Sequence, residues 1–454
     1  MFVPHSHLMT LVLYPLHESL RTFVRRPFDA TTLCHSPAPR YTGVVDKVIA
    51  ANSPCDGSTC FNRYNPNIPM ALTVTNGSVV RFETTDLWDK PGWDYSGDPS
   101  KAQTNMDMAF AKIDIVHILT GPVAVEGAEP GDKLAIEILD IQPLGKGFTM
   151  AGPGLGFIDE LLKPEDVTWV WWDLHPDGWH TDSFPEIVIP YHPFPGTVAV
   201  MPSDTEIDYK LSLMANETTL YGSPAWPVAT NLAVPASVCG ASGTHKERCL
   251  RTLPPGRYFG NTDTQRMMPG TTLLVDCFVT GCGVGIGDVH GAQGDGEVSI
   301  TAIEFPAAVT TKLTVIKPSS PGFNTPTPAM AGTSSITSSS PSEFVSFMGF
   351  PVKESGILPS QYSYLEELEH SRVIPNSMSL AARNALLKLI NFLMTHGGYT
   401  FGQGLVIASA SADLRVAQVV DKPSVGMEAI LHLNIFKGDM YAKMKKAAFP
   451  FASI

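Results

Sequence analysis

The chain has 454 residues, with 31 basic and 44 acidic side chains and a formal net charge of -13. A hydrophobic content of 44% and a charged content of 17% are typical of globular proteins and exclude the disordered and fibrous classes. The negative charge disfavours nucleic acids and anionic membrane surfaces as partners, because both carry the same sign. Apolar runs such as residues 273–279 have strand length, far below the roughly 20 residues of a membrane-spanning helix. We therefore expect no nucleic-acid partner and no membrane association.

The N-terminal segment differs in composition from the rest of the chain. Residues 1–40 contain four arginines and only two acids, Glu18 and Asp29. This composition is typical of a transit peptide, and an uncleaved extension without a targeting role is the alternative. We expect residues 1–44 to form an extension outside the catalytic domain. The expected location is the cytoplasm, with organelle targeting by residues 1–40 as the alternative.

The middle of the chain is dominated by strand patterns. Residues 70–84 predict two short strands joined in a hairpin at Asn76 and Gly77, the strongest short hairpin signal. Apolar runs bounded by Gly, Pro or Asp predict further strands at residues 133–141, 196–201, 271–279 and 297–304. The chain has 38 glycines and 38 prolines, which favours many tight connections and argues against a helix bundle. The predicted fold is mainly β with some α, a sandwich or a barrel-like sheet system.

Two later segments depart from this pattern. Residues 317–345 are rich in Ser, Thr and Pro, which predicts a loop or linker. Residues 379–396 place apolar side chains at i, i+3 and i+4 spacing, which predicts an amphipathic helix packed on the sheet. Residues 437–454 form a short basic tail, best interpreted as a solvated helix end.

The seven cysteines form no CxxC pair. Cys277 and Cys282 lie in an apolar stretch and are interpreted as small core residues. Cys55 and Cys60 bracket a turn-forming run, which permits a small disulfide loop in an oxidising compartment or reduced surface thiols elsewhere. Glycosylation triplets begin at Asn76 and at Asn216 and fit a secreted protein, although such triplets also arise by chance.

The sharpest chemical pattern is GDVHGAQGDGE over residues 287–297. On an extended backbone Asp288 and His290 project to the same side, so that both can reach one metal ion. Asp295 and Glu297 repeat this spacing, and Gln293 lies between the two pairs. The alternative is a set of ordinary turn residues, since Asp-Gly pairs are common in hairpins.

Two further segments carry polar groups. His117 lies three residues after Asp114, where a neutral imidazole can bind a metal or move a proton, and a capped structural histidine is the alternative. Glu129 and Asp132 belong to a Glu-Pro-Gly-Asp turn that by itself explains Asp132. Asp263 lies in GNTDTQ over residues 260–265, where it either bonds its own turn or points into a cleft.

These segments resemble the acetamidase/formamidase family. HILTGP from residue 117, VEGAEPGD to residue 132, GNTD from residue 260 and GDVHGAQGDGE from residue 287 match stretches typical of that family, in the same order. NRYNPNIPM from residue 62 is similar to an early family segment, and ADLRVAQ from residue 412 to a late one. The resemblance covers about residues 45–436, the expected catalytic domain.

The resemblance implies a hydrolase that cleaves the C–N bond of small linear amides, with a divalent metal and a homo-oligomeric assembly. Zinc is the expected metal, with calcium as the alternative. We hypothesise that His117, Asp288 and His290 hold the metal. Glu297 or Asp263 would then move the proton of an activated water, since amide hydrolysis needs an activated water and a protonated leaving nitrogen.

The remaining polar residues of these segments receive supporting roles. We expect Glu129, also a candidate proton carrier, and Asp295 to orient the histidines. Asp132 and Gln293 are expected to stabilise the surroundings of the site. Two other functions remain open from the residues alone: a non-catalytic β-rich module that binds a metal or small ligand, and a lactamase that opens cyclic amides on the same scaffold.

Overall fold

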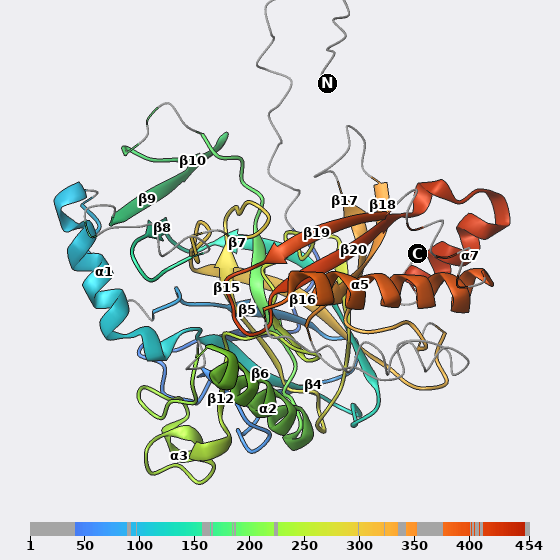
Figure 1. Cartoon of the computed structure of the whole chain (residues 1–454), viewed down its shortest axis with the longest axis horizontal. Coiled ribbons are helices and arrows are strands. Elements are labelled where there is room, and N and C mark those ends of the chain that lie inside the picture. The colour runs from blue at the N-terminus through green and yellow to red at the C-terminus, as the bar shows by residue number, and fades with distance from the viewer. Residues whose placement is uncertain are drawn as a thin grey trace, which may run out of the picture. The chain divides into compact units, whose positions relative to one another are not determined.

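A computed structural model describes most of the chain from residue 41 to residue 449 (Figure 1). The residues within this range that it does not describe are 89–91, 97, 157–163, 165–166, 184, 186–187, 222–225, 298, 322, 335–341, 352–375, 400, 402–403, 405–407 and 409–411. The expected extension at residues 1–40 and the end of the chain from residue 450 lie outside the described residues.

The largest element is a nine-stranded sheet in which only the edge pair β1 and β5 is parallel. Its strands, in spatial order, are β1 (Lys47–Ala50), β5 (Val79–Glu83), β16 (Ala307–Ile316), β7 (Lys133–Pro143), β14 (Thr271–Asp276), β17 (Ala329–Ser334), β18 (Ser342–Gly349), β20 (Gly426–His432) and β19 (Ala412–Gln418). Three of the predicted strands fall close to β7, β14 and, in the second sheet, β11 (Phe194–Ala199).

The second sheet has six strands and carries the polar segments singled out above. They are β13 (Phe259–Asn261), β11, β15 (Val284–His290), β6 (Leu119–Val125) and β2 (Cys60–Phe61), with β4 (Leu72–Val74) pairing in parallel with β6. Every residue of β6, β11 and β15 is buried. Two smaller sheets comprise β8 (Gly147–Ala151), β9 (Thr168–His175) and β10 (Gly178–His180), and β3 (Arg63–Tyr64) with β12 (Leu250–Arg251).

One hydrophobic core joins the two large sheets. Phe82 and Ile136 come from the nine-stranded sheet, and Val198 and Ile286 from the six-stranded sheet, and all four belong to one buried cluster. In β5 buried and partly exposed residues alternate, as expected when only one face of a strand meets the core. The mainly β fold predicted from the sequence is therefore confirmed.

The helices lie outside the sheets. They are α1 (Ala102–Ala111), α2 (Asp204–Tyr221), α3 (Ala236–Cys239), α5 (Met378–Phe392), continued by the π-helical turn η8 (Leu393–Gly397), and α7 (Gly438–Ala448). The helix predicted at residues 379–396 is confirmed by α5 and η8. Ser377 caps α5 by accepting a hydrogen bond from the Leu380 amide, and Ala385 and Leu389 pack in a buried cluster that includes residues of β18 and β20. In the described part of the chain, every helix is too short or too polar to cross a lipid bilayer.

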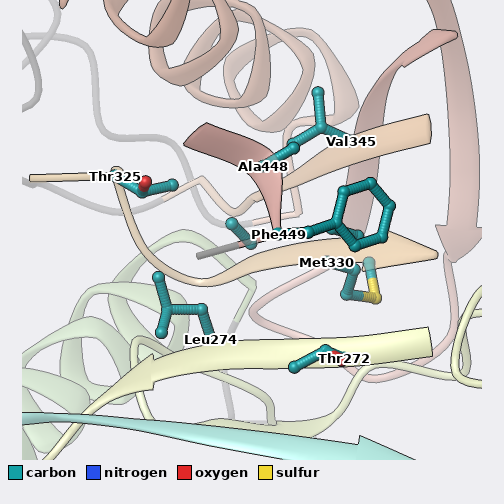
Figure 2. A pocket seen from close by; sticks show the side chains of 9 residues that line it. Thr272, Leu274, Thr325, Met330, Val345, Ala448 and Phe449 are labelled. Carbon is teal, nitrogen blue, oxygen red and sulfur yellow. The ribbon is translucent and has the colours of Figure 1, made fainter. Parts of the chain in front are cut away.

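Helix α7 occupies the segment predicted as a basic tail. Met444 and Ala447 of this helix are buried in the same cluster as α5. Its end, with Phe449, borders a small apolar hollow over β14, β17 and β18, where Phe449 lies beside Met330 (Figure 2). The hollow is lined by apolar and Thr side chains, so it offers no acid–base group.

The predicted hairpin at Asn76 and Gly77 is wrong. β4 pairs with β6 in the six-stranded sheet, whereas β5 pairs with β1 and β16 in the nine-stranded sheet. The turn carries the chain from one sheet to the other, with Gly77 at a positive φ of 89° and the Asn76 side chain accepting a hydrogen bond from the Val315 amide. The turn chemistry was read correctly, but pairing with distant strands determines where each arm goes.

Two other predicted boundaries need correction. The described residues between 297 and 304 form no strand, because Glu297 and Ile300 adopt left-handed backbone conformations that turn the chain. The predicted loop at residues 317–345 contains β17 and the start of β18, which pair with each other. The strand β17 has the sequence AMAGTS, and tertiary pairing with β14 and β18 outweighs its weak local strand preference.

Six cysteines of the described residues form three disulfides: Cys55–Cys60, Cys239–Cys249 and Cys277–Cys282. Cys277 and Cys282 are buried, as predicted, but they are also bonded to each other. Cys55 and Cys60, for which the sequence left two alternatives, are bonded as well.

The core between the sheets should dominate stability. Leu134 of β7 is completely buried in the core, and Leu144, one residue beyond the same strand, is 48% exposed. Because truncation of a buried Leu removes apolar contacts and leaves a cavity, Leu134→Ala should lower the free energy of unfolding by about 2–5 kcal/mol. The matched control Leu144→Ala should change it by less than about 1 kcal/mol. Denaturant unfolding of both variants measures the difference, and equal losses would contradict the placement of the core.

Candidate active site

Strand pairing in the six-stranded sheet brings the polar segments together. Asp288 and His290 lie at the end of β15, and the neighbouring strand β11 pairs Phe194 with His290 and Thr197 with Gly287. On the other side of β15, Gly287 pairs with Leu119 of β6, which His117 precedes by two residues. β13 pairs with β11 and is followed by Asp263. Segments from residues 117, 197, 263 and 288 therefore converge on one place.

His290 is the centre of this cluster. Its side chain is fully buried, and its Nε2 atom lies 3.5 Å from Asp288 Oδ1, 3.7 Å from Glu297 Oε1 and 3.3 Å from Glu304 Oε2. Asp263 completes a second grouping with His290 and Glu297, in which single ligand atoms lie within 4.8 Å of one another. Four carboxyl groups therefore surround one imidazole.

Thr197 connects the second histidine to this cluster. Its Oγ1 atom lies 2.6 Å from Asn261 Oδ1, 3.0 Å from Asp288 Oδ2 and 3.4 Å from His117 Nδ1. One hydroxyl proton serves only one acceptor at a time, so Thr197 donates either to Asn261 or to Asp288. His117 Nδ1 is also 3.3 Å from Asp288 Oδ2.

The network continues to a fifth buried carboxyl group. Asn261 Nδ2 donates to Asp421 Oδ2 at 2.7 Å. Asp421 lies between β19 and β20, and its amide donates to Gln418 Oε1 at 2.8 Å. The Asn261 amide and the Thr197 hydroxyl therefore limit the rotation of the Asp421 and Asp288 carboxylates.

The backbone of the site is held in uncommon conformations. Asp263, Asp288 and Glu297 have positive φ values of 48°, 55° and 47°. Left-handed backbone at non-Gly residues costs on the order of 1–3 kcal/mol each and persists where the surrounding structure enforces it. His117 is fixed differently: its amide donates to Thr252 Oγ1 at 2.8 Å, and that hydroxyl donates back to the His117 carbonyl at 2.7 Å.

Burial and close charges shift the pKa values of these groups in opposite directions. Burial raises the pKa of Asp263, Glu297 and Glu304 above the usual carboxyl range, and it raises the pKa of Asp421 to about 8. Burial also acts to raise the pKa of Asp288, but the adjacent histidines outweigh it and lower that pKa to about 2. Asp288 is therefore the carboxylate that stays ionised over the whole neutral range.

The two histidines also differ. Burial lowers the pKa of His117, and the nearby Asp288 only partly compensates. Burial opposes the charged form of His290 too, but Glu304 and Asp288 raise its pKa well above the usual value. The carboxyl groups around His290 therefore stabilise a positive charge at its imidazole ring.

The cluster fits a divalent cation. Both carboxylate oxygens of Asp263, both ring nitrogens of His290 and Oε2 of Glu304 are buried without a hydrogen bond. Such groups cost about 1–3 kcal/mol each when they stay unsatisfied, and imidazole nitrogens with carboxylate oxygens are the donors that zinc and related cations bind.

The site side chains pack directly against the backbone of Gly196. A Cβ atom at this position would lie only 2.6 Å from Asp263 Oδ1, 2.6 Å from His290 Cε1 and 2.8 Å from Asp288 Oδ2, closer than real Cβ atoms come to such groups. The absence of a side chain at residue 196 therefore lets these three groups meet beside its backbone.

The structure brings five predicted site residues together: His117, Asp263, Asp288, His290 and Glu297. Two further predicted residues border the cluster. Gln293 donates through Nε2 to the Asp263 carbonyl at 2.8 Å. Asp295 lies farther out and is partly exposed, where it accepts hydrogen bonds from Gln265 and Arg415.

Glu129 and Asp132 lie in the turn between β6 and β7. Glu129 accepts a hydrogen bond from Thr280 Oγ1, and Asp132 forms an ion pair with Lys317 at 2.6 Å and accepts from the Glu129 amide. These side chains connect the turn to Thr280 and Lys317, so the structure does not place them against either histidine. The turn interpretation of Asp132 accounts for its bond to the Glu129 amide.

Sequence reasoning missed four residues of the cluster: Thr197, Asn261, Glu304 and Asp421. Asn261 lies inside the GNTD segment, which was the available signal. Glu304 and Asp421 are single acids in apolar surroundings, at 14 and 131 residues beyond His290 by their numbers. Nothing local in either segment indicates a site.

Fold and cluster together define a mainly β protein with a buried histidine–carboxylate centre. Residues 49–438 match the Acetamidase/Formamidase family. The chain is 27% identical over 394 residues to a formamidase from Methylophilus methylotrophus, covering 84% of this chain and 90% of that protein. It is 28% identical over 373 residues to an acetamidase from Mycolicibacterium smegmatis, covering 77% and 85%.

Solved structures show the same fold. An acetamidase from Bacillus halodurans is similar with a TM-score of 0.59 at 21% identity, covering 86% of this chain and 98% of that one. A γ-lactamase from Delftia acidovorans is similar with a TM-score of 0.57 at 25% identity, covering 87% and 94%. The chain therefore belongs to the acetamidase/formamidase family, and the predictions of the family and of an amide-hydrolysing enzyme are confirmed.

The close packing of the site against Gly196 is testable. Gly196→Ala should place a methyl group among Asp263, His290 and Asp288 and reduce turnover of a cleaved amide by about 100-fold or more, because displacements near 1 Å cost that much. The control Gly294→Ala has no heavy atom within 4 Å of the added carbon and should keep activity. Gly196 has no positive φ, so circular dichroism and thermal unfolding should show a folded protein. Full activity of Gly196→Ala would contradict the inference that the site requires a residue without a side chain at position 196.

Proposed function

We propose that the protein hydrolyses small linear amides such as formamide or acetamide to the carboxylate and ammonia, assisted by a divalent metal at the His290 cluster. The observation that carries the proposal is the buried imidazole of His290 among four carboxyl groups, with several oxygen and nitrogen atoms that make no hydrogen bond. The names of the curated relatives support linear amides as the substrate class.

His117, Asp288 and His290 are the proposed metal ligands. Asp288 and His290 form a close grouping with Glu304, which is a further oxygen donor. His117 lies outside that grouping and is near it through Asp288 Oδ2, 3.3 Å from its Nδ1 atom. When bound, the cation would polarise the amide carbonyl and lower the pKa of a bound water, so that hydroxide forms near neutral pH. Zinc is the proposed ion on the basis of the mixed nitrogen and oxygen donors, with calcium as the alternative.

Glu297 and Asp263 are the proposed proton carriers. Burial raises the pKa of both above the usual carboxyl range, so each can hold a proton near neutral pH and release it again. One of them would accept the proton of the attacking water and deliver it to the departing nitrogen. General acid–base catalysis of this kind contributes typically about 10²- to 10⁴-fold.

The surrounding residues position these groups. Thr197 and Asn261 fix Asp288 and Asp421, and Thr252 fixes the backbone of His117. Gln293 holds the Asp263 carbonyl. Glu129 has no part in this proposal, because its carboxylate bonds to Thr280.

The family match over residues 49–438 supports residues 45–436 as the catalytic domain, with residues 1–44 as an extension and 437–454 as a C-terminal segment. Homo-oligomeric assembly and a cytoplasmic location stay predictions from the sequence.

Cyclic amides are the second candidate substrate class. The γ-lactamase from Delftia acidovorans has 25% identity and covers 87% of this chain, so the scaffold is compatible with a lactamase. A substrate panel with formamide, acetamide and a γ-lactam separates the two classes.

The proposed function predicts metal-dependent ammonia release. Purified protein should release ammonia from formamide or acetamide, lose this activity with a chelator, and regain it with one divalent ion. Ammonia measured by a coupled assay is the readout. Activity that survives complete metal removal would contradict the proposed role of a metal. Turnover of the γ-lactam but of neither linear amide would contradict linear amides as the substrate class.

A pair of histidine variants localises the metal. His290→Ala removes the ligand at the centre of the cluster, so bound metal should fall below one tenth of the wild-type content and activity by at least about 10³-fold. His175 is exposed and lies outside the cluster, and His175→Ala should retain both. Elemental analysis gives the metal content independently of activity, and wild-type metal content in His290→Ala would refute the assignment.

The raised carboxyl pKa values predict a pH-dependent effect of metal on stability. In the metal-free fold, the carboxyl groups with raised pKa values keep protons that the unfolded chain has already released. Their contribution to folding stability therefore falls as pH rises from about 4 to the pKa of about 8 for Asp421. The lowered pKa of Asp288 contributes stability that increases with pH. This contribution is complete above about pH 4, so it stays constant between about pH 4 and 8. A cation replaces the protons, so its stabilisation should grow with pH.

The rise in melting temperature on adding metal should therefore be larger at pH 8 than at pH 5.5. Differential scanning calorimetry at a fixed metal concentration measures this rise. An equal rise at both pH values would mean that metal binding displaces no protons from the carboxyl groups.

A further inference from the structure

All six cysteines within the described residues occur in pairs. The Cα–Cα distances are 5.9 Å for Cys55–Cys60, 5.7 Å for Cys239–Cys249 and 4.8 Å for Cys277–Cys282, within the range of about 4.4–6.8 Å that disulfides require. Apart from Cys55, each of these cysteines is at most 2% exposed. Unrelated thiols would not be expected to fall into three bonding pairs.

The Cys239–Cys249 pair lies next to the segment that holds His117. Cys249 precedes β12, and Thr252, the next residue after that strand, makes both hydrogen bonds to the His117 backbone, at 2.8 and 2.7 Å. Arg251 of β12 forms an ion pair with Asp114 at 3.4 Å, three residues before His117. The pair therefore fixes one end of the short segment that clamps a site histidine.

The other two pairs border strands of the same sheet. Cys60 begins β2 and pairs across the sheet with Thr120, three residues after His117. Cys282 lies two residues before β15, the strand that ends in Asp288 and His290. Each of the three cysteine pairs thus lies close in the chain to a strand or clamp that carries the site.

The loops closed by these pairs are short, with sequence separations of 5, 10 and 5 residues. Short loops remove less entropy from the unfolded chain than long loops do, and each bond also fixes the backbone beside the site.

We propose that the three disulfides form in the mature protein, that they position the site through the Thr252 clamp and strand β15, and that the protein works in an oxidising compartment. Each bond forms when two thiols transfer two electrons and two protons to a disulfide oxidant, which is reduced to its dithiol. Reducing compartments keep such pairs as thiols, so this proposal competes with the predicted cytoplasmic location. Asn76 and Asn216, which begin the two glycosylation triplets, are exposed and agree with the oxidising compartment.

Thiol counting tests the bonds without any assay of function. Protein produced in an oxidising compartment is denatured and alkylated before and after reduction, and intact mass gives the number of labels. One label before reduction, on Cys34, and seven after it are expected. Peptide mapping should then recover the three pairs. Three or more labels before reduction would overturn the proposal.

Metal affinity tests the positioning role, and this part rests on the proposed function. The Cys239→Ser/Cys249→Ser double variant should bind zinc about 10- to 100-fold more weakly, the usual cost of losing a group that orients a ligand. Thr252→Val removes the clamp and keeps the disulfide, and it should show the same loss, while Thr252→Ser should restore affinity. Isothermal titration calorimetry measures affinity, and circular dichroism confirms that each variant is folded.

The two proposals fail in different ways. Wild-type zinc affinity in both the double variant and Thr252→Val would overturn the positioning role, even with three disulfides present. Three disulfides in a wild-type protein that binds no metal and releases no ammonia would leave the bonds established and refute the proposed function instead.

Discussion

The site depends on one electrostatic constraint: five carboxyl groups are buried around two histidines. Two unit charges about 4 Å apart interact by roughly 4 kcal/mol at an effective dielectric constant of 20, so these groups cannot all ionise without compensating positive charge. Desolvation adds to this cost, as the raised pKa values of Asp263, Glu297, Glu304 and Asp421 show. A cation bound here would relieve this repulsion, and the carboxylate oxygens that make no hydrogen bond would be its ligands.

The rest of the fold provides the rigidity that this concentration of charge requires. Strands β6, β11 and β15 are buried along their whole length, and they pack through one core on the nine-stranded sheet. Left-handed backbone at Asp288 is retained because β11 and β6 pair on either side of its strand. Outside the strands, side chains hold the backbone, as Thr252 does by its hydrogen bond to the His117 carbonyl. The packed surroundings therefore stabilise the left-handed backbone and the buried charges of the site.

Much of the fold and part of the site were accessible from sequence. Apolar runs bounded by Gly and Pro located β7, β11 and β14, and helical periodicity located α5. Asp288 and His290 were found because they are neighbours in one motif. The prediction assumed an extended backbone, whereas Asp288 adopts a left-handed conformation, yet the two side chains still lie 3.5 Å apart. The failures have a common physical origin, namely interactions between residues distant in the chain. The turn at Asn76 forms, but β4 and β5 join different sheets, and no local signal determines this choice.

The same limit explains the missed residues. Asp421 reaches the cluster through Asn261 from a turn far along the chain, and Glu304 joins it because its backbone pairs with Phe148 and His290. Conversely, Glu129 belongs to a segment typical of the family, but its carboxylate accepts a hydrogen bond from Thr280, between β14 and β15, and not from a site residue. A sequence motif reveals functional residues that are neighbours in the chain, whereas a buried charge cluster is assembled by tertiary packing.

The most direct test of a metal held by the His290 cluster is anomalous diffraction from crystals of the protein grown with zinc. The account predicts an anomalous peak at about 2.0–2.2 Å from an imidazole nitrogen of His290 and a carboxylate oxygen of Asp288. A fully occupied zinc bound elsewhere, with the cluster containing only water, would contradict it.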